Sequence, residues 1–169
     1  LINRSPAQVD AINTHGLRLR QGDDERVVKL RASVNCQGLR PADLVIVLVK
    51  SFDTRAAIEA AAPIVRPDTV VLSLQNGLGH EDVLAEVVGR ERVLAGKTYV
   101  GGVMLAPGRV VAGTLGKQTF IGELDGSTSA RAQATKSLKL LIFLASLPSS
   151  YQMRPRSPPP RCRCTCRSA

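Results

Sequence analysis

The sequence of 169 residues has no Trp, only 3% aromatic residues and no long hydrophobic run. A membrane span needs roughly 18 to 20 consecutive apolar residues, so the sequence predicts no membrane-spanning helix and no membrane partner. Residues 1–6 lack the basic region and apolar stretch of a secretory signal. Hydrophobic residues nevertheless make up 44% of the chain, which is enough for a core and excludes wholesale disorder.

Acidic residues are missing from one end of the chain. Every Asp and Glu and all 14 glycines precede position 134, while five of the ten prolines and three of the four cysteines follow it. The basic residues there therefore carry most of the formal net charge of +9. This composition predicts a globular domain over residues 1–133 and a non-globular, disordered basic tail over residues 134–169.

The tail contains two features that resemble binding sites, and we interpret neither as one. Clustered arginines attract phosphate, but the positive charges do not line one face. Cys162-x-Cys164-x-Cys166 lacks the wider spacing, the fourth ligand and the nearby histidine typical of structural zinc. We therefore expect no nucleic-acid partner and no metal. With only Cys36 elsewhere, no disulfide framework is evident, which favours a reducing cytoplasm.

Apolar runs alternate with helical patterns before the tail. Strands are predicted over 43–50 and 69–74, helices over 57–65 and 81–88, and a third extended element over 93–104. We expect Ser51 and Asp53 to cap the first of these helices. This order is typical of a βαβ array, in which helices cover a parallel sheet. A hairpin around 22–24 and short strands over 108–122, closing one sheet edge, complete the prediction.

Polar residues follow two of the predicted strands. Lys50 ends one and Gln75-Asn76-Gly77 follows the next, and ligands of open α/β sheets bind outside the carboxyl ends of the strands. Lys supplies a mobile positive charge for phosphate or carboxylate, and Asn supplies both a donor and an acceptor. Each feature alone is also typical of a solvated strand end or an ordinary turn. Their coincidence on neighbouring strands favours a binding site.

Three stretches are more specific: Val-Leu-Val-Lys-Ser at 47–51, Ser-Leu-Gln-Asn-Gly-Leu-Gly at 73–79 and Ala-Gly-Lys-Thr-Tyr-Val-Gly-Gly at 95–102. Together they resemble the ketopantoate reductases, also called 2-dehydropantoate 2-reductases, and the resemblance runs over residues 1–133. It implies NADPH-dependent reduction of 2-dehydropantoate, a small 2-keto acid, to pantoate on the route to pantothenate and coenzyme A. It also implies a cytoplasmic oxidoreductase with an N-terminal Rossmann domain and a helical C-terminal domain.

The resemblance assigns NADP binding to four positions. Arg4 matches a basic residue that grips the 2′-phosphate, for which an arginine is chemically suited. Lys50 and Asn76 match polar residues that line the cofactor and substrate cleft. Gly102 matches a small position where the backbone meets the cofactor.

The sequence also departs from the family pattern. No Gly-x-Gly-x-x-Gly turn occurs in it, and we expect about 25 residues before Leu1 in a whole family member. The predicted fold class is therefore α/β, an incomplete Rossmann-type doubly wound parallel sheet with a non-globular basic tail. The resemblance places the catalytic lysine in the C-terminal domain, which we expect to be absent, so no catalytic residue is assigned. A frameshift near codon 134 is our hypothesis for the tail.

Two functional interpretations stay open. One is the cofactor part of a reductase, a fragment inactive alone, and the other is a non-catalytic NADP-binding remnant or pseudogene product. Loss of the first strand would leave unpaired backbone and exposed apolar faces, so we expect a marginal, aggregation-prone product. The sequence does not specify an oligomeric state.

Overall fold

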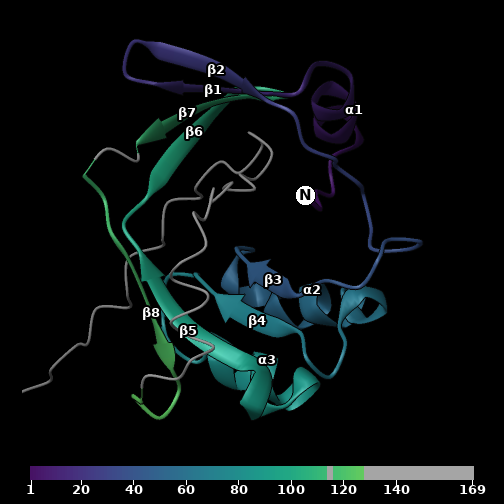
Figure 1. Cartoon of the computed structure of the whole chain (residues 1–169), viewed down its shortest axis with the longest axis vertical. Coiled ribbons are helices and arrows are strands. Elements are labelled where there is room, and N and C mark those ends of the chain that lie inside the picture. The colour runs from purple at the N-terminus through teal and green to yellow at the C-terminus, as the bar shows by residue number, and fades with distance from the viewer. Residues whose placement is uncertain (114–115, 128–169) are drawn as a thin grey trace, which may run out of the picture.

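The computed structural model describes residues 1–113 and 116–127, in which strands form a curved wall and helices pack against it (Figure 1). The helices are α1 (Pro6–His15), α2 (Thr54–Ala60) and α3 (His80–Val88), with short 3₁₀ turns η1 (Ser51–Asp53), η2 (Ala62–Ile64) and η3 (Arg90–Arg92). The strands are β1 (Leu17–Gln21), β2 (Asp24–Val28), β3 (Leu44–Val47), β4 (Val70–Ser73), β5 (Val93–Thr98), β6 (Gly101–Ala106), β7 (Arg109–Gly113) and β8 (Thr119–Glu123).

The first sheet has the order β3-β4-β5-β8. Strands β3, β4 and β5 run parallel, and β8 closes one edge antiparallel to β5. Successive side chains of a strand point to opposite faces, and β3 and β4 are apolar at nearly every position. Both faces of the sheet are therefore apolar. Val71 packs with residues of α2 and α3 on one face, whereas Leu72 packs with Leu94 on the other. The predicted strands, the covering helices and the closing edge strand are thereby confirmed.

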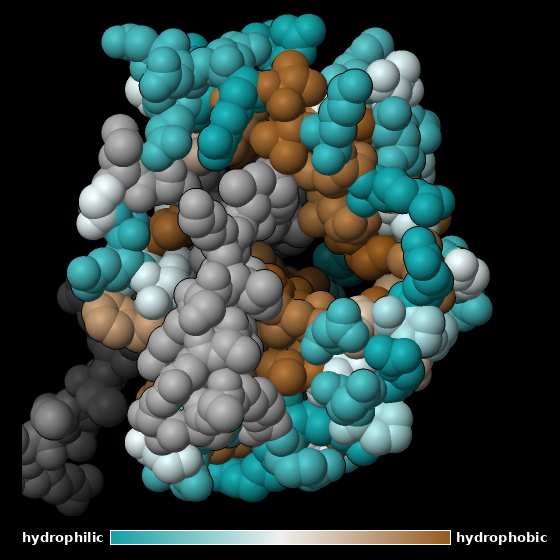
Figure 2. Space-filling view, in the orientation of Figure 1, coloured by the Kyte–Doolittle hydropathy of each residue, from teal (hydrophilic) through white to brown (hydrophobic). Residues whose placement is uncertain are grey.

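Strand β3 is the other edge of this sheet within the described residues, since it pairs only with β4. Its residues Leu-Val-Ile-Val carry no charge, and only Val47 is buried. Figure 2 shows hydrophobic side chains gathered around a hollow on the visible face of the molecule. An uncharged, apolar edge is the kind that recruits further strands, and aggregation of the product stays a prediction.

The second sheet, ordered β2-β1-β7-β6, corrects the prediction of a single sheet. The predicted hairpin is present as β1 and β2, but β1 also pairs in parallel with β7, far along the chain. The expectation of one extended element over 93–104 is wrong. Its first half is β5 of the first sheet, and its second half is β6 of the second sheet. Nothing in local periodicity encodes such a change of partner, because it depends on pairing between distant segments.

Helix α1 was not predicted, although its start carries a recognisable signal. The Ser5 side chain accepts a hydrogen bond from the backbone N–H of Gln8, and Pro6 occupies the first turn. Both features are typical of a helix N-terminus. The buried Gln8 side chain also accepts a hydrogen bond from the N–H of Gly108 at 2.9 Å, which ties the helix to the turn before β7.

The predicted boundary near residue 133 and the basic tail lie outside the described residues. In the described ranges, no helix combines the length and the apolar content that crossing a membrane requires.

Candidate functional site at the carboxyl ends of β3 and β4

Lys50 and Asn76 lie at the same edge of the first sheet. Val47 and Ser73 are direct partners in the parallel pairing of β3 with β4, and each site residue follows three positions later. Both side chains are exposed. The structure therefore brings these two predicted residues to adjacent strand ends, where open α/β sheets bind ligands.

A buried side chain that was not predicted as a site residue joins the two strand ends. The Gln75 amide nitrogen donates to the carbonyl oxygen of Val49 at 2.9 Å and to the hydroxyl oxygen of Thr54 at 2.8 Å. Gln75 is only 9% exposed and Thr54 only 1%. Gln75 belongs to one of the recognised sequence stretches, but the sequence predicts no role for it, because its partners lie more than 20 positions earlier in the chain.

The loop after β4 is shaped by glycines and by one histidine. Gly77 has a φ of 106° and Gly79 a φ of 84°, a region of backbone space that favours glycine. The imidazole Nε2 of His80, the first residue of α3, lies 2.8 Å from the carbonyl oxygen of Asn76. A carbonyl only accepts, so the Nε2–H tautomer makes this bond. The loop is thus fixed by β4 at one end and α3 at the other.

Arg4 reaches the same edge from the start of the chain. Its guanidinium donates to the carboxylate of Asp53 at 2.8 Å, and Asp53 belongs to η1, directly after Lys50. The Arg4 side chain is 73% exposed, which leaves most of its donors facing solvent. Asp53 occupies the predicted N-cap position of α2, but its side chain makes no capping hydrogen bond. Ser51 does not cap this helix, because it begins η1. Asp53 binds Arg4 instead.

Gly102 does not share this edge. It lies in β6 of the second sheet, opposite Ala112 of β7. The structure therefore collects three of the four predicted cofactor residues at one place and leaves the fourth on another sheet.

Two large apolar side chains stand exposed beside the polar ones. Phe52 is 76% exposed in η1, and Leu78 is 97% exposed between the two loop glycines. Cationic side chains, an amide and exposed apolar groups together suit a ligand that carries both phosphates and flat rings, as a nicotinamide dinucleotide does. In this respect the residues present fit a nicotinamide dinucleotide.

The fit does not extend to the pyrophosphate. Phosphate groups bind at helix N-termini that present free N–H groups without competing negative charge. The Gly77-Leu78-Gly79 turn leads into α3, whose first turn carries Glu81 and Asp82. These carboxylates oppose an anion, so this turn is not a pyrophosphate cradle.

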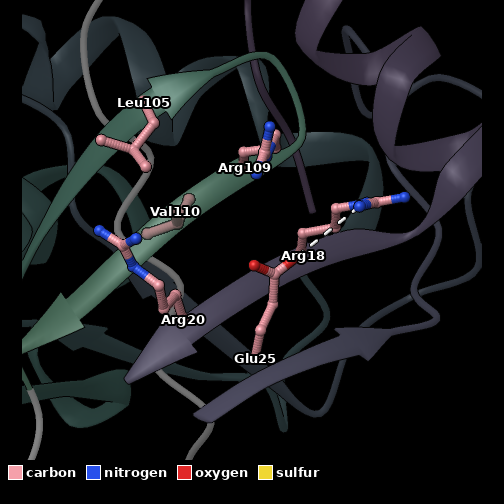
Figure 3. A pocket seen from close by; sticks show the side chains of 6 residues that line it. All are labelled: Arg18, Arg20, Glu25, Leu105, Arg109 and Val110. Atoms are coloured by element: carbon pink, nitrogen blue, oxygen red, sulfur yellow. Dashed lines mark ion pairs between the residues drawn. The ribbon is translucent and has the colours of Figure 1, made fainter. Parts of the chain in front are cut away.

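A shallow depression on the second sheet is separate from this edge. Figure 3 shows its lining side chains, of which Arg18 and Arg109 are direct partners on β1 and β7. Arg18 lies 3.7 Å from the carboxylate of Glu25. None of the predicted site residues lines this depression, so the carboxyl ends of β3 and β4 remain the candidate site.

Comparison with known proteins identifies the family of this chain. The family model for ketopantoate reductase PanE/ApbA matches residues 1–126. The 2-dehydropantoate 2-reductase of Halobacterium salinarum is 37% identical over 132 residues, which is 78% of this chain and 43% of the relative. The 2-dehydropantoate 2-reductase of Pyrococcus horikoshii is 40% identical over 102 residues, or 60% of this chain and 32% of the relative. The chain thus spans less than half the length of these relatives.

Solved structures show the same fold. A PanE/ApbA family ketopantoate reductase from Ralstonia eutropha superposes with a TM-score of 0.63 at 37% identity, covering 69% of this chain and 39% of its own. A D-mandelate dehydrogenase, solved with NADH and anilino(oxo)acetate, gives a TM-score of 0.71 at 26% identity, covering 82% and 43%.

The match to the family model covers well over half of the chain, and the mixed α/β fold with its parallel strands is the Rossmann-like fold of the related structures. The resemblance seen in the three sequence stretches is confirmed. The chain belongs to the ketopantoate reductase PanE/ApbA family.

Proposed function

We propose that this chain is the nucleotide-binding part of an NADPH-dependent 2-dehydropantoate 2-reductase, in which the substrate is a small 2-keto acid. The observation that carries this proposal is the placement of Lys50 and Asn76 on adjacent carboxyl ends of β3 and β4, with Arg4 beside them through Asp53. The curated relatives named above are 2-dehydropantoate 2-reductases, which supports the choice of reaction.

Each residue has a distinct part in binding. The exposed guanidinium of Arg4 would hold the 2′-phosphate that distinguishes NADP from NAD. Lys50 would attract a phosphate or the substrate carboxylate as a mobile positive charge. Asn76 would orient its ligand through one donor and one acceptor. Gly102, which lies on the second sheet, keeps its assignment from the family resemblance only.

The bound nicotinamide supplies the hydride for ketone reduction. The residues at this edge bind and orient, and we assign no catalytic residue to this chain. The alternative function is a non-catalytic NADP-binding remnant or pseudogene product. The two interpretations share the same binding edge, and both expect this chain alone to bind NADPH without reducing a substrate.

Titration with NADPH and NADH, followed by nicotinamide fluorescence, tests the proposal on the full 169-residue chain. We expect NADPH to bind more tightly than NADH, and Arg4→Ala to remove that preference, because an exposed guanidinium would no longer meet the 2′-phosphate. Arg20→Ala is the matched control, since Arg20 is an exposed arginine on β1 of the second sheet.

Lys50→Ala should weaken the binding of both dinucleotides, whereas Lys29→Ala, another exposed lysine, should not. Absence of any NADPH binding would overturn the proposed function. Oxidation of NADPH on addition of 2-dehydropantoate would overturn the interpretation of this chain as inactive alone.

A further inference from the structure

The hydrogen bonds around Gln75 hold the backbone on both sides of Lys50. Gln75 reaches the carbonyl of Val49, the residue before Lys50. It also reaches the hydroxyl of Thr54, which in turn donates to the carbonyl of Ser51, the residue after Lys50, at 2.8 Å. Two carbonyls that flank Lys50 are therefore fixed, directly or through one hydroxyl, by a single side-chain amide.

The same residue also begins the other half of the site. Asn76 follows Gln75 in the chain, and its carbonyl accepts from His80. A displacement of the loop after β4 would therefore move the Gln75 amide and, through it, the backbone on either side of Lys50.

Burial makes this arrangement costly to break. Gln75 and Thr54 have almost no contact with water, so a lost partner leaves a buried polar group unsatisfied. The amide nitrogen has two hydrogens and both are used, which fixes the orientation of the side-chain amide. The buried Gln75 amide therefore keeps the carbonyl oxygen of Val49 and the hydroxyl oxygen of Thr54 at a fixed distance from each other.

We propose that Gln75 is a positioning residue that couples Lys50 to Asn76, so that the two side chains meet one ligand as a unit. The inference deepens the proposed function and rests on it for the identity of the ligand, NADPH. The coupling itself is a property of the chain and is measurable without any ligand.

The first test uses Gln75→Met, which keeps an unbranched side chain of similar size and removes the hydrogen bonds. The Asp53 backbone N–H donates to the Lys50 carbonyl at 2.9 Å and reports on this loop. We expect hydrogen exchange of the Asp53 amide to accelerate about tenfold in Gln75→Met, together with chemical-shift changes at Lys50 and Ser51. NADPH affinity should fall by a similar factor.

Gln8→Met is the matched control, because Gln8 is a buried glutamine whose amide also joins distant segments. It should accelerate exchange at Gly108, where its bond ends, and leave Asp53 exchange and NADPH affinity unchanged. A merely destabilising role for Gln75 would make the two variants behave alike at Asp53, which would overturn the proposal.

Thr54 supplies a second pair of variants if Gln75→Met folds poorly. Thr54→Val removes the hydroxyl at nearly constant shape and should reproduce the accelerated exchange at Asp53, while Thr54→Ser retains the hydroxyl and should restore slow exchange. Unchanged exchange in Thr54→Val would overturn the coupling. Faster exchange in Gln75→Met with no NADPH binding by the unaltered chain would support the coupling and overturn the proposed function instead.

Discussion

The two sheets of this chain differ in where they place their polar residues. In the sheet β3-β4-β5-β8, the central strand residues Val71, Leu72, Val93 and Leu94 are completely buried, and the polar groups lie beyond the strand ends. In the sheet β2-β1-β7-β6, β1 alternates buried Leu17 and Leu19 with exposed arginines, so its polar groups lie on the face of the sheet.

This difference explains why the candidate site belongs to the first sheet. The strands β3 and β4 run parallel and are apolar on both faces, so their polar side chains lie beyond the strand ends and converge on one edge. A sheet with one open face spreads its charges over that face, as Arg18, Arg20 and Arg109 show in Figure 3. Convergence of the site residues thus follows from the parallel direction and the burial of the strands in the first sheet.

The largest contrast should appear when one leucine is shortened in each sheet. Leu72 is 0% exposed in β4, whereas Leu105 in β6 is 56% exposed. Leu72→Ala should lower the free energy of unfolding by about 2–5 kcal/mol because it leaves a cavity, and Leu105→Ala by less than about 0.5 kcal/mol. Urea denaturation followed by circular dichroism measures both. Equal losses would show that Leu105 is as buried as Leu72.

The turns of the two sheets give the next contrast. An added Cβ at Gly77 would meet the His80 Nε2 at 3.0 Å, and its φ of 106° lies outside the left-handed helical region. Gly22, in the turn between β1 and β2, has a φ of 62° and open space around it. Gly77→Ala should therefore cost about 1–3 kcal/mol, and Gly22→Ala about 1–2 kcal/mol at most.

Thermal unfolding of the two glycine variants measures this difference. Gly77→Ala should also change the chemical shift of the Asn76 backbone, because its carbonyl is held by His80. A variant Gly77→Ala with unchanged stability and unchanged Asn76 shifts would mean that the loop after β4 is not fixed as described.

These contrasts also mark what could be predicted from the sequence. The β3 and β4 strands, helix α3 and the convergence of Lys50 with Asn76 follow from local apolar runs and from the geometry of parallel sheets. The second sheet could not be predicted from the sequence, because the β1–β7 pairing joins Arg18 to Arg109 across most of the described chain. The role of Asp53 was missed for the same reason, since its partner Arg4 is 49 positions away.

A smaller effect on NADPH affinity should distinguish the Arg4–Asp53 ion pair at the candidate site from the Arg18–Glu25 ion pair on the second sheet. Asp53 binds the Arg4 guanidinium that we propose for the 2′-phosphate, so its carboxylate competes with that phosphate. Asp53→Ala should tighten NADPH binding by about twofold to fivefold, the scale of an exposed ion pair, and leave NADH binding nearly unchanged. Fluorescence titration at low salt measures both affinities.

Glu25→Ala is the control for this change, because Glu25 pairs with Arg18 on the second sheet. It should alter neither affinity. If Asp53→Ala weakened NADPH binding, Asp53 would be holding Arg4 in place for the ligand rather than competing with it.

The smallest expected effect concerns Cys36, which is buried with the helix-covered core of the first sheet. Burial raises the pKa of this thiol above its ordinary value of 9.0, so the folded chain keeps the proton to higher pH than the unfolded chain. The thiol therefore contributes stability below pH 9 that is lost as pH rises through its folded pKa.

Cys36→Ala should remove that part of the pH dependence, so the difference in unfolding free energy between the two chains should shrink between pH 8 and pH 10.5. Other groups titrate in this range in both chains, and the difference between them isolates Cys36. A difference independent of pH would mean that the thiol ionises equally in the folded and unfolded chains. Cys36 would then be open to water, and the helix-covered core of the first sheet would be incomplete at that point.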